Sequence, residues 1–592
     1  MNRARSSFAL VCLALASLAG CVPDGERPRS ERGAAGFPLA RILEAEDARP
    51  AAGPDLDALI AGAGAGAEDA RLRRTAVRAL GRLENAALIS DIEPHLGDID
   101  PGVRAAAVEA LGQAVHGRDG STVLTRLLAR VEMEPDPSAR GALARSMGRL
   151  TLEAADRRRA AEALARLAGA DGLVGAPETL LGVALGFEAL LRGSGNGPDR
   201  DGLDRAAADR LEAMAAFRAD SGDDVDAARI RALAVASLGR ARRLGVAVVE
   251  RAAADLDPEV RRAPLPFLGA LAPSQRPAIL ERALGDPSPR VAIDALRIVA
   301  AGPRTSESCA QLFQAAAPPS APAVRVVALE ALGRPCPDAR EQRDLLRRTA
   351  AELPAGDSAV WQPAAQALLS LARIDKNNTT ALLPRFVTHE SPFVRARAAT
   401  VAGLVEAEAH LQALAADVSP NVRVPALEAL FAARGHGIDG LLLDQLESDD
   451  TQLLVTVARP LEGSPGRTAV AAALMVRFER LSSARRETWR DPRRSLLERI
   501  GELGGASLAD RVRPLSSRTT MRRSQHMLLS SSERGASRTP HPRPSRSLAR
   551  PYPRPLSWRR SPKAPCCCTC AAVARSWSSS SRISRRGTRG AS

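Results

Sequence analysis

Asp-Pro-Gly-Val-Arg-Ala-Ala-Ala-Val-Glu-Ala-Leu-Gly, residues 100–112, is the stretch of this chain that decides its fold. Val103, Ala107 and Leu111 follow one another at a spacing of four residues, which places them on one face of a helix. Asp100 suits the N-cap, and Pro101 suits the first helical turn because its missing N–H needs no partner there. The stretch therefore predicts an amphipathic helix that begins at Pro101.

The same phrase recurs along most of the chain. It returns as Asp-Pro-Glu-Val-Arg at residues 257–261 and as Pro-Ala-Val-Arg at residues 322–325. The copies start near Asp69, Asp100, Asp136, Asp226, Asp257, Asp286, Ala321, Asp357, Ser391 and Ser419, with a weaker copy at Asp450. A period of this size predicts a solenoid of repeated helical units. The gap between Asp136 and Asp226 is expected to hold degenerate copies, with one helix at 178–191.

Three details of the repeat carry separate predictions. The arginine after the valine, such as Arg104, lies off the apolar face, so we expect it to pair with an acidic residue of the adjacent turn rather than to bind a ligand. Pro264 and Pro266 fall inside one expected helix and predict a kink or break there. The Leu-Gly dipeptides are expected to end helices as left-handed caps at Gly112, Gly269 and Gly333.

The repeats resemble the HEAT family, in the short bacterial form also found in phycobilisome lyases. The resemblance covers about residues 69–505 and implies an all-α fold, a right-handed α-solenoid of stacked antiparallel helix pairs. It does not imply bilin-lyase activity, since unrelated proteins use the same repeats and nothing in the chain suggests a chromophore. The functional question becomes which surface of the solenoid binds a partner.

The front of the chain resembles the signal of bacterial lipoproteins. Arg3 and Arg5 precede an apolar run at residues 8–18 that is too short to span a bilayer, and Leu-Ala-Gly-Cys at 18–21 matches the lipobox. The resemblance implies cleavage after residue 20 and lipidation of Cys21. An ordinary secretory signal with a chance cysteine is the alternative. Val22 favours the periplasmic face of the outer membrane, with the chain held there by its lipid anchor.

Composition divides the remainder into three parts. Residues 21–54 are expected to be a tether with one short helix at 39–48, residues 55–513 the solenoid, and residues 514–592 a disordered tail rich in Arg, Ser and Pro. The formal charge of +15 belongs to that tail, which holds 17 basic residues and one acidic residue, Glu533. Because the solenoid is close to neutral, no nucleic-acid partner is predicted.

The tail has the character of a frameshift product. Only two of the 83 basic residues are lysines, Lys376 and Lys563, which indicates a GC-rich gene. Read two nucleotides later in GC-rich codons, residues 515–533 give another copy of the repeat. The same offset over residues 558–587 gives V-V-E-L-E-L-P-D-L-A-P-R, which resembles the opening of a cyclophilin-type peptidyl-prolyl isomerase. That domain is not expected in the printed chain, so no isomerase activity is predicted for it.

The sequence contains no recognisable catalytic or cofactor motif. There is no phosphate-binding glycine loop, no H-E-x-x-H and no G-x-S-x-G. The seven histidines are scattered and are expected at surfaces or helix ends, and the single C-x-x-C of Cys567 and Cys570 has no second pair. No cofactor, metal site or catalytic residue is therefore predicted.

Two cysteines of the expected solenoid, Cys309 and Cys336, lie about one repeat apart. They could form a disulfide in the oxidising periplasm, but the sequence does not establish that they are close.

These observations are compatible with three functions. The favoured hypothesis is a lipid-anchored scaffold that binds envelope proteins. The second is the scaffold portion of a periplasmic cyclophilin whose catalytic domain is lost by frameshift. The third is a genuine basic tail that binds anionic lipid or nucleic acid, with strongly salt-dependent affinity.

Overall fold

The computed structural model describes residues 39–64, 68–169, 176–192, 203–218, 225–356, 360–484, 486–504 and 508. In these ranges the chain forms helices, and the one β-feature is an isolated bridge between Asp119 and Thr151. The predicted all-α class is therefore confirmed. Residues 1–38, with the expected signal and Cys21, and the expected tail 514–592 lie outside the described residues.

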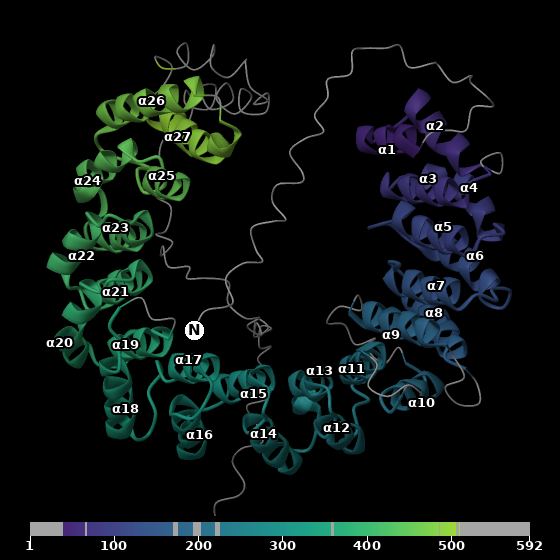
Figure 1. Ribbon diagram of the computed structural model, residues 1–592, viewed down its shortest axis with the longest axis horizontal. Coiled ribbons are helices and arrows are strands. Elements are labelled where there is room, and N and C mark those ends of the chain that lie inside the picture. Colours follow the sequence, from purple (N-terminus) through teal and green to yellow (C-terminus); the bar gives the residue numbers. More distant parts are fainter. Residues whose placement is uncertain are drawn as a thin grey trace, which may run out of the picture. The chain divides into compact units, whose positions relative to one another are not determined.

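The chain divides into two units, which meet between Leu430 and Phe431. In unit 1 the helices form two rows, and neighbours along the first row contact each other from α1 to α21 (Figure 1). The first row contains α1 (Leu39–Ala48), α3 (Ala70–Arg82), α5 (Pro101–Ala114), α7 (Pro137–Arg149), α9 (Pro177–Arg192), α11 (Val225–Arg240), α13 (Pro258–Arg262), α15 (Pro289–Ala301), α17 (Pro322–Ala331), α19 (Gln362–Ile374) and α21 (Pro392–Leu404).

The second row lies against the first and alternates with it along the chain. It contains α2 (Pro54–Ala63), α4 (Ile89–Ile92), α6 (Ser121–Val131), α8 (Ala154–Leu167), α10 (Arg205–Met214), α12 (Val246–Ala253), α14 (Arg276–Leu284), α16 (Ser306–Ala316), α18 (Ala339–Ala351), α20 (Lys376–Val387) and α22 (Glu408–Ala415). α23 (Pro420–Arg434) crosses the unit boundary. Unit 2 continues with α24 (Asp439–Asp444), α25 (Thr451–Ala458), α26 (Arg467–Ser483) and α27 (Arg490–Leu503).

Short 3-10 helices fill several connections. They are η1 (Ala86–Leu88), η2 (Glu93–Gly97), η4 (Leu265–Ala270), η5 (Pro273–Gln275), η6 (Gly435–Ile438), η7 (Gln445–Glu447) and η8 (Glu487–Trp489). The break between α13, which ends at Arg262, and η4, which begins at Leu265, confirms the effect expected from Pro264 and Pro266.

Acidic N-caps start α3, α5, α7 and α13 as predicted. The Asp100 carboxylate accepts a hydrogen bond from Val103 N at 2.9 Å, and Asp136 accepts one from Ala139 N at 2.9 Å. The helix expected at 178–191 is α9. One copy was placed wrongly, since α19 begins at Gln362 and not directly after Asp357.

The glycines of the Leu-Gly dipeptides do not act as helix caps. None of Gly112, Gly269 and Gly333 has a positive φ, and Gly112 lies inside α5. A Cβ atom at Gly112 would come within 2.6 Å of Ser146 Oγ on α7. The expected caps were wrong, because at Gly112 the missing side chain serves close packing between neighbouring first-row helices.

The first described helix belongs to the packed stack. α1 occupies residues 39–48, as expected for a short helix there, and packs on α2 and α3. Ile42 and Ala45 are fully buried. Packing therefore begins inside the segment expected to be a tether.

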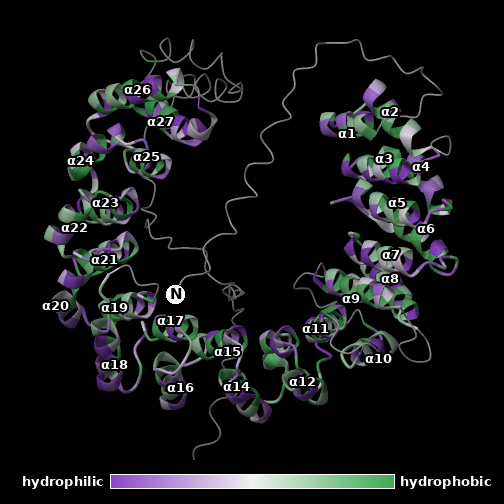
Figure 2. Cartoon of the chain, in the orientation of Figure 1, coloured by the Kyte–Doolittle hydropathy of each residue, from purple (hydrophilic) through white to green (hydrophobic). Residues whose placement is uncertain are grey.

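Hydrophobic and hydrophilic residues alternate along the helices (Figure 2), and the buried apolar side chains form a core cluster that runs from Ile42 to Ala295. Phe187 and Phe386 are among the largest buried side chains. Among the described helices, none combines the length and the apolar character needed to cross a membrane.

Candidate functional site

The arginine of the repeat joins neighbouring repeats at five places in unit 1. Arg104 on α5 donates from Nε and Nη2 to the two carboxylate oxygens of Glu134, at 2.9 and 2.7 Å. Its Nη1 donates to the carbonyl oxygens of Asp98 and Ile99, in the turn that precedes its own helix, at 2.9 and 3.1 Å. One guanidinium thus ties its own turn to the acidic residue of the following turn.

This arrangement recurs at equivalent positions, and we call it the arginine ladder. Its other bidentate pairs are Arg73–Asp98, Arg231–Asp255, Arg261–Asp286 and Arg395–Asp417. The prediction that this arginine pairs with an acidic residue of the adjacent turn is confirmed. These guanidiniums hold the fold and are not free to bind a ligand.

The ladder lowers the pKa of its carboxylates. Burial alone would raise the pKa of Asp255, but hydrogen bonds from Arg231 and from the Asp257 backbone N–H hold it below its usual range. The same balance lowers the pKa of Asp286 and Asp417. For Asp98, the hydrogen bond from Arg73 is the largest cause and also lowers the pKa. These carboxylates are therefore charged near neutral pH and unsuited to general acid catalysis.

His389 replaces the ladder aspartate in one repeat. Its Nδ1 accepts the Ser391 N–H at 3.1 Å, the bond that Asp98 makes to Asp100, and its Nε2 lies 2.8 Å from Pro354 O. The residue is only 9% exposed, and it directly follows Thr388, the C-cap of α20, so the expectation of a surface or helix-end position is confirmed by its helix-end place. Both ring nitrogens are occupied, so His389 is structural.

The two solenoid cysteines come together. The Cys309 and Cys336 sulfur atoms lie 2.04 Å apart and their Cα atoms 6.1 Å apart, with Cys309 on α16 and Cys336 in the turn after α17. The oxidation state of the pair in the cell stays a prediction. The other predicted site residue, Cys21, lies outside the described part of the chain, as do Cys567 and Cys570.

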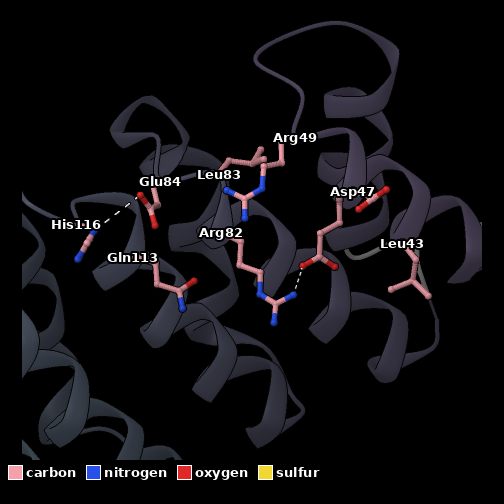
Figure 3. A pocket seen from close by; sticks show the side chains of 9 residues that line it. Leu43, Asp47, Arg49, Arg82, Leu83, Glu84, Gln113 and His116 are labelled. Carbon is pink, nitrogen blue, oxygen red and sulfur yellow. Dashed lines mark hydrogen bonds and ion pairs between the residues drawn. The ribbon is translucent and has the colours of Figure 1, made fainter. Parts of the chain in front are cut away.

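A polar hollow of about 480 Å³ opens at the ends of α1, α3 and α5 (Figure 3). It is lined by Leu43, Glu46, Asp47, Arg49, Arg82, Leu83, Glu84, Gln113 and His116. Arg49 and Glu84 have left-handed backbones, with φ of 46° and 51°, just after α1 and α3. Arg82 pairs with Glu46, and the His116 side chain is 75% exposed. The hollow is open to solvent, and the charged groups of its lining include the Arg82–Glu46 ion pair. Its lining holds no nucleophile beside a base.

A second hollow, of about 550 Å³, lies between α16 and α18 beside the cysteine pair. Phe313, Ala310 and Leu345 supply apolar lining, and Asp338, Glu341 and Arg348 supply polar groups. Across the described ranges, no group of three or more His, Cys, Asp or Glu residues could hold a metal ion. Neither hollow offers a catalytic constellation.

Exposed apolar side chains mark the turns that lead into first-row helices. Ile99, Leu256 and Val418 occupy the same position, directly after the ladder aspartate, and are 90%, 78% and 88% exposed. Trp361 and Phe393, at the starts of α19 and α21, stack at 6.3 Å between ring centroids with planes 3° apart. Aromatic composition of 3% gave no sign of this pair, because the rings meet only across neighbouring repeats. We call these five residues the apolar turn edge.

Comparisons with known proteins agree with this architecture. Residues 56–148 match a family model described as HEAT repeats. No curated protein matches the chain.

Among solved structures, yeast importin-β (Kap95p) is 12% identical with a TM-score of 0.51, over 80% of this chain and 71% of that protein. A Kap121p mutant is 15% identical with a TM-score of 0.44, over 81% of this chain, which spans only 59% of the Kap121p chain. At such identities the likeness concerns the fold alone. The described chain is an α-solenoid of the HEAT type, with HEAT repeats matched at residues 56–148.

Proposed function

We propose that this chain is a lipid-anchored scaffold that binds proteins of the bacterial envelope at the periplasmic face of the outer membrane. The observation that carries the proposal is the repeated helix-pair architecture, whose buried arginines serve the stack and whose outer surfaces remain available. The apolar turn edge supports protein binding, because Ile99, Leu256 and Val418 repeat one exposed position. Kap121p has been solved with bound Pho4p, so a solenoid of this class can bind a protein.

The anchor rests on the lipobox residues 18–21. The test is metabolic labelling with a radioactive fatty acid in a bacterial host, followed by fractionation. The intact chain should carry label and sediment with outer membranes, while Cys21→Ser should lose both properties. A matched Cys309→Ser variant should keep the label. Equal labelling of the wild-type chain and Cys21→Ser would refute the anchor.

Partner binding is tested by crosslinking in envelope extracts. A triple variant, Ile99→Ser, Leu256→Ser and Val418→Ser, should lose crosslinked partners that the wild-type chain captures. Replacing three exposed residues of the second row, such as Thr122, Arg158 and Glu162, with serine is the matched control. Loss of the same partners from both variants would show that the apolar turn edge does not direct binding.

The alternative is the scaffold portion of a periplasmic cyclophilin-type peptidyl-prolyl isomerase whose catalytic domain is lost by frameshift. It is favoured by the abrupt change of composition after residue 513 and by the shifted reading of residues 558–587. Resequencing the gene from about codon 500 past codon 592 tests it. An isomerase barrel in the restored frame would favour this alternative, and an intact printed frame would remove it.

A further inference from the structure

Three arginines converge on one short segment at the C-terminal ends of α15, α17 and α19. Arg304, which follows α15, donates from Nη2 to Ala331 O at 2.9 Å. Arg334, which follows α17, donates from Nη1 to Ala300 O at 3.1 Å. Arg373 of α19 packs over Gly333, where a Cβ atom would lie 3.1 Å from its Nη1. The side chains of Arg304 and Arg373 therefore lie against the backbone of residues 331–334, and Arg334 extends from that backbone to the end of α15.

This group of arginines has no acidic partner. No salt bridge joins Arg304, Arg334 or Arg373 to a described carboxylate, in contrast to the arginine ladder. The Nε of Arg304 is buried and has no hydrogen-bond partner. Burial, and then the nearby charge of Arg334, lower the pKa of Arg304. Positive charge without a carboxylate partner thus gathers near the ends of α15 and α17, where an anion would be attracted.

The backbone that carries the group is held rigidly. Gln342, only 1% exposed, donates from Nε2 to Leu332 O at 2.6 Å and to Arg334 O at 2.7 Å, and its Oε1 accepts the Cys336 N–H at 2.9 Å. The Cys336 sulfur atom lies 2.04 Å from that of Cys309. The backbone from which Arg334 extends is therefore held in place, which reduces the entropy lost on binding.

The hydrogen bonds from Arg304 and Arg334 to backbone carbonyl oxygens use only part of the donor groups of these arginines. Each guanidinium has five N–H donors. Arg334 uses one guanidinium nitrogen in its bond to Ala300 O, and Arg373 makes no hydrogen bond or ion pair with a described residue. The exposed side chains of Arg334 and Arg373 therefore have donors left for a ligand, beside the half-buried Arg304 with its buried Nε.

We propose that Arg304, Arg334 and Arg373 form a binding site for a phosphate-class oxyanion. The planar, multiply donating guanidinium matches the oxygens of phosphate, and the positive charge of these groups attracts it. The ligand is either free phosphate or the phosphate group of a larger molecule. The site does not depend on the lipid anchor or on a protein partner.

The test is isothermal titration calorimetry of the full chain with inorganic phosphate, and separately with glycerol phosphate. Arg334→Gln and Arg373→Gln should each weaken binding by about tenfold or more, since each removes a hydrogen bond between two charged groups. Arg297→Gln is the matched control, because Arg297 lies on α15, is 65% exposed and pairs with Asp294. Circular dichroism verifies that each variant is folded.

The two ligands separate the sources of the anion. Binding of inorganic phosphate alone points to free phosphate, and binding of both points to a phosphate group carried by a larger molecule. Absence of binding by the folded wild-type chain at millimolar concentrations of either ligand would overturn the proposal. So would equal weakening by Arg334→Gln and Arg297→Gln, which would indicate unspecific charge attraction.

Discussion

Arg231 on α11 and Asp255, which follows α12, form the most deeply buried rung of the arginine ladder. Two hydrogen bonds of 2.8 Å join the guanidinium to the carboxylate, and the side chains are 5% and 2% exposed. Asp255 also accepts, at 3.0 Å, the N–H of Asp257, which is the N-cap of α13. One carboxylate therefore joins a helix of one repeat to the turn that starts the next.

Removing this carboxylate should destabilise unit 1 strongly. Asp255→Ala leaves Arg231 buried without its partner, which lowers the free energy of unfolding by about 3–5 kcal/mol. Hydrogen exchange should rise first in α11 and α13, since solenoid repeats contact only their neighbours. Lys376→Met, which removes an exposed pair with Glu406, is the control and should leave exchange unchanged. Unchanged exchange in Asp255→Ala would mean that the ladder contributes little.

The ladder also predicts how stability depends on pH. The pKa values of Asp255, Asp286 and Asp417 are lowered in the folded chain from the ordinary value of 3.8. Their contribution is present above that value and is lost as pH falls through the lower folded values. Urea midpoints should therefore be stable near neutral pH and fall below about pH 4. The urea midpoint of Asp417→Asn should fall less at low pH than that of the wild-type chain. An equal fall in both proteins would exclude the Arg395–Asp417 pair as a cause.

Close packing of glycines predicts a steric effect between α7 and α9. A Cβ atom at Gly148 would lie 2.0 Å from Gly186 O, a backbone atom that cannot rotate away. Gly148→Ala should lower the free energy of unfolding by about 1–3 kcal/mol, although alanine is the better helix former. At Gly440 on α24, where no atom lies within 4 Å, the same change should be neutral or stabilising. Thermal unfolding of both variants, monitored by circular dichroism, distinguishes the two effects.

The cysteine pair predicts a redox effect on stability. Cys309 and Cys336 are separated by 27 residues, and a bridge closing that loop contributes about 3–4 kcal/mol in the chain-entropy model. The double variant Cys309→Ser and Cys336→Ser should unfold at lower urea and lose its response to reductant. Mass spectrometry under non-reducing conditions measures the bridge directly. Two free thiols in protein isolated from an oxidising compartment would contradict it.

Local pattern alone predicted where several first-row helices begin. Asp100, Pro101 and the apolar spacing that follows act within one turn of chain, so the start of α5 could be predicted from neighbouring residues. Pro264 and Pro266 likewise broke their helix where expected, because proline acts on its own backbone. The pairing of Arg104 was predictable in kind, since its position off the apolar face required a polar partner.

Contacts between repeats were decided only by the tertiary structure. The role of Gly112 depends on Ser146 of the next helix, and Trp361 meets Phe393 more than thirty residues later. The convergence of Arg304, Arg334 and Arg373 requires three consecutive first-row helices to be stacked. Local periodicity determines which face of a helix is buried. The distance and angle at which two such faces meet depend on side-chain packing across the whole contact, which the sequence of either helix does not contain.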